Sequence, residues 1–166
     1  MIRVALITVS NKNSADNMLN EEIVEDLLKN LNGEEVYCKH VTEDFRILQE
    51  ELFKITEKGL ADLVLTTGGT GLARENITPE ATMAVIEKET PGITELMRQK
   101  TAKKFPDIAL SRGRAGIRKS TLIINLPDEE KQIIESLKSL FGIIPQGVEV
   151  LKRDYMNHRY HELKLW

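Results

Sequence analysis

The sequence predicts an α/β fold with a mostly parallel sheet and helices on its faces. Short apolar runs rich in β-branched residues alternate along the chain with longer stretches of helical period, which is the pattern of strands and crossover helices. The length of 166 residues suits a single domain over 1–166, whose core is large enough to need no disulfide or metal. No repeat, low-complexity segment or linker divides the chain.

Four apolar runs are the predicted strands. Each is short and bounded by polar or turn-forming residues, as strands in a sheet core are. The second run alternates between apolar and polar residues, which is typical of a strand nearer the sheet edge. The four runs are Arg3–Val9, Glu35–Val41, Ala61–Thr66 and Thr121–Leu126.

Helices are predicted between and after these strands. Thr78-Pro79-Glu80 predicts a helix start, since a hydroxyl can cap it, proline needs no N–H there and an acid suits the first turn. That helix is expected to reach about Glu89, and Pro91 to open the next. The other predicted features are a face of Ile23, Leu27, Leu28 and Leu31 ended by Gly33, a face of Leu48, Leu52, Ile55 and Leu60, helices over Pro91–Lys104 and Glu129–Leu140, and a shorter helix from Pro145.

Composition excludes several classes of protein. A net charge of −3, with acids and bases mixed along the chain, provides no broad basic surface for nucleic acid. Cys38 is the only cysteine, which excludes an internal disulfide and a thiolate zinc site and fits a reducing cytoplasm. The first apolar run is far shorter than a membrane span and has no signal-peptide cleavage site. We therefore expect a cytoplasmic protein that binds neither nucleic acid nor a membrane.

The glycine-rich stretch Thr66-Thr67-Gly68-Gly69-Thr70-Gly71 follows directly on the third predicted strand. Ligands bind at the carboxyl edge of open parallel sheets, and glycines let backbone N–H groups approach a phosphate while the threonines add donors. The stretch lacks the Lys-Ser/Thr of a nucleoside triphosphatase loop and the spacing of a dinucleotide loop. On glycine content alone, a tight structural turn and a ligand-binding loop are equally good interpretations.

Three further blocks follow this stretch in a recognisable order. With it, they closely resemble the molybdopterin adenylyltransferase family, called MogA or MoaB in bacteria, and the match in order and spacing runs from the first strand to the Pro145 helix. The blocks are Asn76-Ile77-Thr78-Pro79-Glu80-Ala81-Thr82, Ser111-Arg112-Gly113-Arg114-Ala115-Gly116-Ile117-Arg118 and Leu122-Ile123-Ile124-Asn125-Leu126-Pro127.

The resemblance implies a three-layer α/β/α domain, usually a homotrimer, that binds molybdopterin and Mg-ATP. The family transfers AMP to the terminal phosphate of molybdopterin and releases pyrophosphate, which makes a molybdenum-insertion protein a possible partner. By position, the glycine loop would hold the nucleotide and its phosphates, and other residues would surround the ligand. These implied ligand-binding residues are Ser10, Thr67, Gly68, Gly69, Thr70, Gly71, Glu80, Ser111, Gly116, Leu126 and Pro127. Glu80 is equally well interpreted as a first-turn acid that interacts with the helix dipole.

Carboxylates that place magnesium are where the chain departs from the family. The family usually has an aspartate after its second strand, where this chain has Glu43 with Asp44 beside it, and another after the glycine loop, where this chain has Asn76. We assign these three residues to metal binding and catalysis. An amide oxygen can bind magnesium but brings no negative charge, so metal affinity is expected to fall.

Two more departures concern the edges of the expected ligand site. Asp128 follows Leu126-Pro127 where the family often has glycine, and the first loop reads Ser10-Asn11-Lys12-Asn13 where the family usually has Ser-Asp. The cations Arg112, Arg114, Arg118 and Lys119 could receive a ligand phosphate or form a solvated charged turn.

The aromatic residues of the C-terminal tail have two interpretations, whereas its histidines have one. Its aromatic residues either pack on this domain or a neighbour, or belong to an edge strand or frayed end. His158 and His161 have no acidic or thiol companions, so no metal is assigned to them.

Two alternatives to an active adenylyltransferase remain open. One is a catalytically weakened relative that binds pterin or nucleotide without turnover. The other is a structural trimer that serves another enzyme of the cofactor pathway and binds no ligand.

Overall fold

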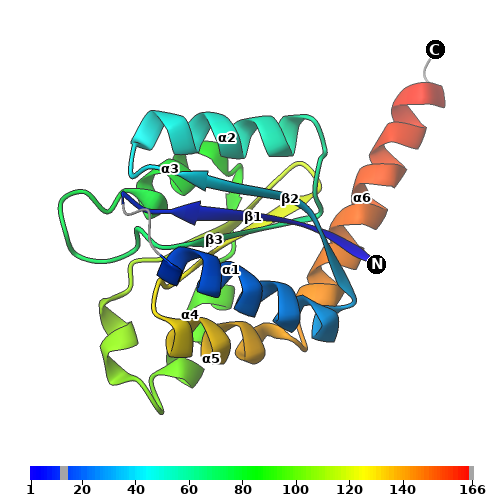
Figure 1. Cartoon of the computed structure of the whole chain (residues 1–166). Coiled ribbons are helices and arrows are strands. Elements are labelled where there is room, and N and C mark those ends of the chain that lie inside the picture. Colours follow the sequence, from blue (N-terminus) through cyan, green and yellow to red (C-terminus); the bar gives the residue numbers. More distant parts are fainter. Residues whose placement is uncertain (12–14, 165–166) are drawn as a thin grey trace.

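A computed structural model describes residues 1–11 and 15–164. Six strands form one sheet in the order β2-β1-β3-β6-β5-β4, and helices cover both faces (Figure 1). The strands β2, β1, β3 and β6 run parallel, whereas β5 and β4 are antiparallel to their neighbours. The strands are β1 Ile2–Val9, β2 Gly33–Val41, β3 Leu63–Thr67, β4 Lys88–Glu89, β5 Ala115–Arg118 and β6 Thr121–Leu126. All four predicted strands are therefore confirmed, with the alternating one at the edge.

The two faces of the sheet bury separate sets of apolar residues. Along β1, Val4 and Leu6 face one core while Ala5 and Ile7 face the other, as the two-residue period of a strand requires. The first core lies against α1 Ala15–Leu28, α4 Pro91–Thr101, α5 Glu130–Leu140 and the start of α6 Ile144–Lys164, and the second against α2 Phe45–Glu57 and α3 Thr78–Val85. The predicted three-layer α/β/α architecture is confirmed.

The helix after the glycine loop ends earlier than predicted. α3 stops at Val85 because Glu87 and Thr90 donate their backbone N–H groups to Ile117 and Ala115 of β5. Pairing within the sheet thus overrides the helical pattern that predicted a helix end near Glu89. The sequence block that contains Ala115 forms the strand β5.

Two predicted helix ends were also assigned to the wrong residue. The first helical region, which continues as the 3-10 turn Lys29–Leu31, ends at Asn32, whose φ of 51° is left-handed, while Gly33 already starts β2. Thr78 is not the cap of α3; its hydroxyl donates to the carbonyl of Gly68 at 2.9 Å and so ties the helix start to the glycine loop.

The helix from Pro145 was predicted to be short, and this was wrong. α6 spans 21 residues and takes up most of the tail, where we considered an edge strand or frayed end. Ile144 and Val148 pack on the core, and the second half projects away from the sheet (Figure 1). Trp166 lies outside the described residues.

Candidate functional site

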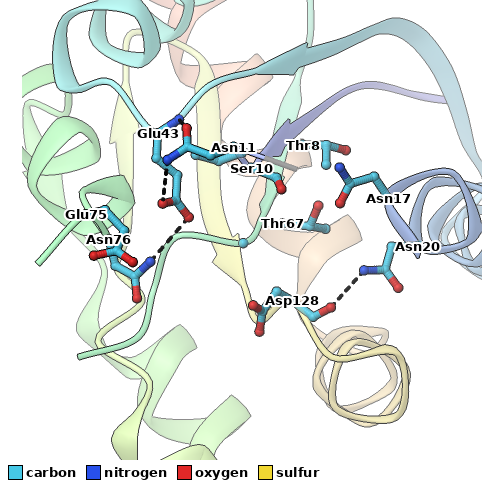
Figure 2. A pocket seen from close by; sticks show the side chains of 12 residues that line it. Thr8, Ser10, Asn11, Asn17, Asn20, Glu43, Thr67, Glu75, Asn76 and Asp128 are labelled. Carbon is cyan, nitrogen blue, oxygen red and sulfur yellow. Dashed lines mark hydrogen bonds between the residues drawn. The ribbon is translucent and has the colours of Figure 1, made fainter. Parts of the chain in front are cut away.

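The first candidate site is a cavity at the carboxyl ends of β1, β3 and β6. Because these strands are parallel neighbours, the loops that follow them meet at one edge of the sheet. The cavity has a volume of about 390 Å³ and is drawn in Figure 2. It is lined by Thr8, Val9, Ser10, Asn11, Asn17, Asn20, Glu43, Thr67, Gly68, Glu75, Asn76 and Asp128.

The glycine loop needs its glycines for close backbone approach. Gly68 and Gly69 have φ of 87° and 69°, which side chains other than glycine seldom adopt. A Cβ at Gly68 would overlap the carbonyl oxygen of Val9, and one at Gly69 the hydroxyl of Thr78. A Cβ at Gly71 would lie 2.7 Å from Oδ1 of Asn76. The loop is therefore held tightly against β1 and the start of α3.

Thr67 presents a buried hydroxyl to this cavity. Its exposed fraction is 2%, and within 1–11 and 15–164 its Oγ1 has no hydrogen-bond partner. A buried hydroxyl without a partner costs free energy of about 1–3 kcal/mol, and a ligand that bonds to it would recover that cost. The neighbouring Thr66 differs, because its hydroxyl accepts a hydrogen bond from Asn125 at 2.9 Å.

Asn125 holds the elements behind the loop together. Its Nδ2 donates to the hydroxyls of Thr66 in β3 and Thr82 in α3, both at 2.9 Å, and its Oδ1 accepts from the backbone of Arg114 at 3.0 Å. Asn125 and both threonines are fully buried. One side chain thus joins two strands, a helix and the 111–114 segment.

Glu43 and Asn76 meet on one wall of the cavity (Figure 2). The carboxylate of Glu43 accepts hydrogen bonds from the amides of Asn76 and Asn11, each at 3.3 Å. Asn11 also accepts from the backbone N–H of Glu43 at 2.9 Å. Asp44 does not line the cavity; it caps α2 by accepting from the backbone of Ile47 at 3.0 Å. Of the three residues assigned to the metal, two are therefore brought together.

The donor set on this wall suits magnesium bound together with substrate phosphates. Mg²⁺ in proteins commonly takes one or two carboxylates and completes its shell with phosphates and water. Glu43 offers a carboxylate and Asn76 an amide oxygen, once the amide has turned from its present hydrogen bond. In the described part of the chain no three acidic, histidine or cysteine residues lie close enough to hold a metal alone.

Several lining residues were missed as site residues. Thr8, Asn17, Asn20 and Glu75 lie in loops or on β1 and α1 with no glycine motif to mark them, whereas Asp128 was noticed only as a departure from the family. Asn20 fixes the turn after β6 by donating to the carbonyl oxygen of Asp128 at 2.7 Å (Figure 2). The signal that could have identified them is their position, because each strand contributes a polar residue where it ends at this edge of the sheet.

The charged side chains in the described lining of this cavity are all acidic. Its described lining includes Glu43, Glu75 and Asp128 and neither lysine nor arginine. A nucleotide triphosphate could not bind among three carboxylates without a cation that screens its phosphates.

A second cavity, of about 410 Å³, lies beside α3 and the 111–114 segment and has the opposite character. Arg98, Arg112 and Arg114 line it with a single acid, Glu80. Arg98 donates to the carbonyl oxygen of Gly113 at 3.1 Å, and Arg114 forms an ion pair with Glu89 at 2.8 Å. The remaining lining residues are Pro79, Met83, Ser111 and Gly113. This cavity has the charge needed to accept a phosphate directly.

Arg112 connects the second cavity to the glycine loop. Its guanidinium donates to the carbonyl oxygens of Gly71 at 2.8 Å and Asn76 at 2.9 Å and forms an ion pair with Glu80. Its backbone N–H donates to the carbonyl of Thr70 at 2.8 Å. Burial alone would raise the pKa of Glu80, but hydrogen bonds from Arg112 and from the backbone of Glu80, together with the charges of Arg112 and Arg114, outweigh it and leave that pKa below its ordinary value.

The remaining assigned residues occupy different places. Ser10, Thr67 and Gly68 line the acidic cavity, and Ser111 and Glu80 line the basic one. Gly69, Thr70, Gly71, Leu126 and Pro127 follow β3 or end β6 beside these cavities but are not among their lining residues. Gly116 lies in β5, outside both, where a Cβ would overlap Ile86. Arg118 and Lys119 lie elsewhere too, because both bond to Glu57.

The fold and these cavities define an α/β domain suited to a phosphate-bearing ligand at the carboxyl edge of its sheet. A family model described as a probable molybdopterin binding domain matches residues 5–146. The chain belongs to this family of molybdenum cofactor biosynthesis proteins.

Similar proteins include enzymes of this pathway. The chain is 43% identical over 136 residues to molybdopterin adenylyltransferase of Helicobacter pylori, covering 82% of this chain and 76% of that protein. It is 35% identical over 134 residues to molybdopterin adenylyltransferase of Escherichia coli K12, covering 74% and 69%. The crystal structure of the molybdopterin biosynthesis enzyme MoaB from Thermus thermophilus superposes with a TM-score of 0.85 at 35% identity, covering 91% of this chain and 96% of that one.

Among the described helices, none is both long and apolar enough to span a membrane.

Proposed function

We propose that this protein binds molybdopterin and Mg-ATP and transfers AMP to the terminal phosphate of molybdopterin. A phosphate oxygen of molybdopterin attacks the α-phosphorus of ATP, a new P–O bond forms, and the bond to the leaving pyrophosphate breaks. The hydroxyl of Thr67 beside the glycine loop, which has no hydrogen-bond partner among the described residues, is the observation that carries this proposal. Two relatives named molybdopterin adenylyltransferase, at 43% and 35% identity, support the same reaction.

The two cavities suggest how the substrates divide between them. The acidic cavity takes the nucleotide with its metal, and Glu43 and Asn76 would hold Mg²⁺, which supplies positive charge against the developing anion. The basic cavity takes the phosphate of molybdopterin on its arginines. The glycine loop lies between them, where Arg112 keeps it in position. The protein's contribution is then mainly positioning, as is general for phosphoryl transfer.

Pyrophosphate release tests this proposal directly. Purified protein incubated with molybdopterin, ATP and magnesium should release pyrophosphate, and omission of molybdopterin should abolish the release. No release above a control without enzyme, with substrate that a known adenylyltransferase turns over, contradicts the proposal.

A weakened, ligand-binding relative is the second candidate function. One observation favours it: the amide of Asn76 brings no charge and already donates to Glu43. This candidate requires calorimetric binding of ATP or molybdopterin without turnover, and activity restored by Asn76→Asp. Strong activity of the unchanged protein would reject it.

We further propose one domain over 1–166, a homotrimer in the cytoplasm, and delivery of product to a molybdenum-insertion protein. Trimerisation and delivery are taken from the family resemblance. Sedimentation equilibrium at the mass of one chain would reject the trimer. Pull-down from native lysate tests the partner, and a structural trimer without enzymatic role would be captured yet bind no ligand.

A further inference from the structure

A third cavity lies at the amino ends of the strands, opposite the glycine loop. Its volume is about 320 Å³, and it forms where the α2–β3 connection, the β5–β6 turn and α6 converge. Five basic side chains line it, from segments far apart in the sequence: Arg3, Lys58, Lys119, Lys152 and Arg159. The carboxyl-edge site uses none of them.

The charge of this cavity is unbalanced. Among the described residues that line it, the acids are Glu57 and Asp62, so five bases face two carboxylates in a chain whose net charge is −3. Asp62 is held by Arg3 at 2.8 Å and Lys152 at 3.1 Å. Its side chain is 4% exposed, so it pairs with these two bases inside the structure and is not open to solvent.

Three cations remain beyond those that the acids can neutralise. Lys119 bonds to Glu57 at 2.6 Å, but Glu57 also pairs with Arg118, which lies outside the cavity. Lys58 and Arg159 form no ion pair with any residue that the structure describes. Lys119 moreover has φ of 51°, a conformation that glycine adopts more readily, so a cation occupies a turn where a smaller residue would be less strained.

We propose that this cavity binds a small phosphate-bearing anion, either free phosphate or a phosphate monoester. Lys58, Lys119 and Arg159 supply the charge that a dianion requires, and Ser120 adds a hydroxyl. Tyr155 and Met156 provide an apolar wall for a small organic group. The volume lies at the lower end of the range for small-molecule sites, about 300–1,000 Å³, which suits a small anion better than nucleic acid.

The site is independent of adenylyl transfer. The sheet separates it from the glycine loop by the length of a strand, roughly 17 Å for the five residues of β3. Anion binding here would connect the projecting helix α6, through Lys152 and Arg159, to the body of the domain.

Titrations followed by NMR test the proposal on the full chain. Inorganic phosphate and ribose 5-phosphate are added at constant ionic strength, and amide shifts are followed at residues 58–59, 119–120 and 152–156. Saturable shifts there, without matching shifts at Thr67 and Gly68, are expected. Tighter binding of ribose 5-phosphate identifies a monoester site, and equal or weaker binding identifies a site for the free ion.

A charge-reversal pair supplies the matched comparison. Lys58→Glu with Arg159→Glu should weaken binding by about tenfold or more, because two attractive charges become repulsive. Lys103→Glu with Lys131→Glu makes the same change in net charge at exposed helix-associated sites outside every cavity described here and should leave affinity unchanged. Equal loss in both pairs, or shifts that never saturate, would overturn the proposal. Circular dichroism confirms that both variants are folded.

Discussion

The side-chain amide of Asn76 donates a hydrogen bond to the carboxylate of Glu43 at 3.3 Å. Two residues from loops 33 positions apart therefore form one wall of the acidic cavity. The contact is favourable because it pairs a neutral donor with a negative acceptor, and it would become repulsive if both residues were carboxylates.

Asn76→Asp is predicted to trade stability for metal affinity. Two adjacent carboxylates should lower the melting temperature without metal, and Mg²⁺ should recover it because the site gains a charge. We expect magnesium to bind roughly tenfold tighter, about 1.4 kcal/mol, and adenylyl transfer to rise with it. The melting temperature, measured by thermal unfolding with and without Mg²⁺, tests both the loss of stability and its recovery. Asn30→Asp, which adds the same charge on the exposed turn after α1 and outside the cavity lining, should leave magnesium affinity unchanged.

Thr67→Val is predicted to impair ligand binding without destabilising the fold. Its hydroxyl has no partner within the described chain, so valine removes an unsatisfied polar group and leaves the shape nearly unchanged. ATP affinity should fall by about tenfold, the value of one good hydrogen bond. Thr66→Val is the counterpart: it leaves a donor of Asn125 unpaired, and the free energy of unfolding should fall by about 1–3 kcal/mol. Calorimetric ATP titration and urea unfolding separate the two, and unchanged ATP affinity in Thr67→Val would remove that hydroxyl from the site.

Arg112→Lys is predicted to loosen the glycine loop. The planar guanidinium reaches Gly71, Asn76 and Glu80 together, which one ammonium group cannot do. We expect a stability loss of about 1–3 kcal/mol and a raised KM for ATP, with a smaller effect on kcat. Arg114→Lys changes the same residue type two positions on, where the described side-chain contact is an exposed ion pair, and should alter KM for ATP little. Equal effects of the two substitutions would contradict a positioning role for Arg112.

The lowered pKa of Asp62 predicts how the free energy of unfolding depends on pH. Burial alone would raise its pKa, but hydrogen bonds from the side chain and backbone of Arg3 and from Lys152 outweigh burial and hold that pKa below the ordinary 3.8. The lowered pKa stabilises the fold fully above pH 3.8, and this contribution is lost as the pH falls through the lower value in the folded state. Asp62→Asn should therefore be less stable than the unchanged protein at neutral pH, and the difference should shrink only below 3.8. A constant difference from neutral pH down to about pH 2 in urea titrations would reject this account.

Hydrophobic periodicity was sufficient to predict the layers of the fold. The buried parallel strands β1, β3 and β6, the alternating edge strand β2 and the faces of α1, α2 and α5 follow local rules, because one face of each element must be apolar to reach the core. The strands β4 and β5 could not be predicted in this way. Their pairing depends on Glu87 and Thr90 meeting β5 in space, and Lys88–Glu89 is too short and too polar to carry a periodic signal.

The candidate site was predictable only in part, for a similar reason. The glycine loop, Glu43 and Asn76 could be located from motifs, but the acidic contribution of Asp128 and the capping role of Asp44 depend on how loops meet. The resemblance placed Glu80 and Ser111 near the nucleotide loop without indicating that they line a separate, basic cavity. The division of charge between the two cavities is a property of the tertiary structure.

Asn125 should be among the positions least tolerant of replacement in a saturation-mutagenesis library. Its amide uses both hydrogens as donors and its oxygen as acceptor, all inside the structure. Aspartate has no hydrogens to donate, glutamine is longer by one methylene, and leucine offers no polar atom, so each leaves buried groups unpaired or overlapping. Selection for folded protein alone would therefore keep asparagine there, whatever ligand the cavities accept.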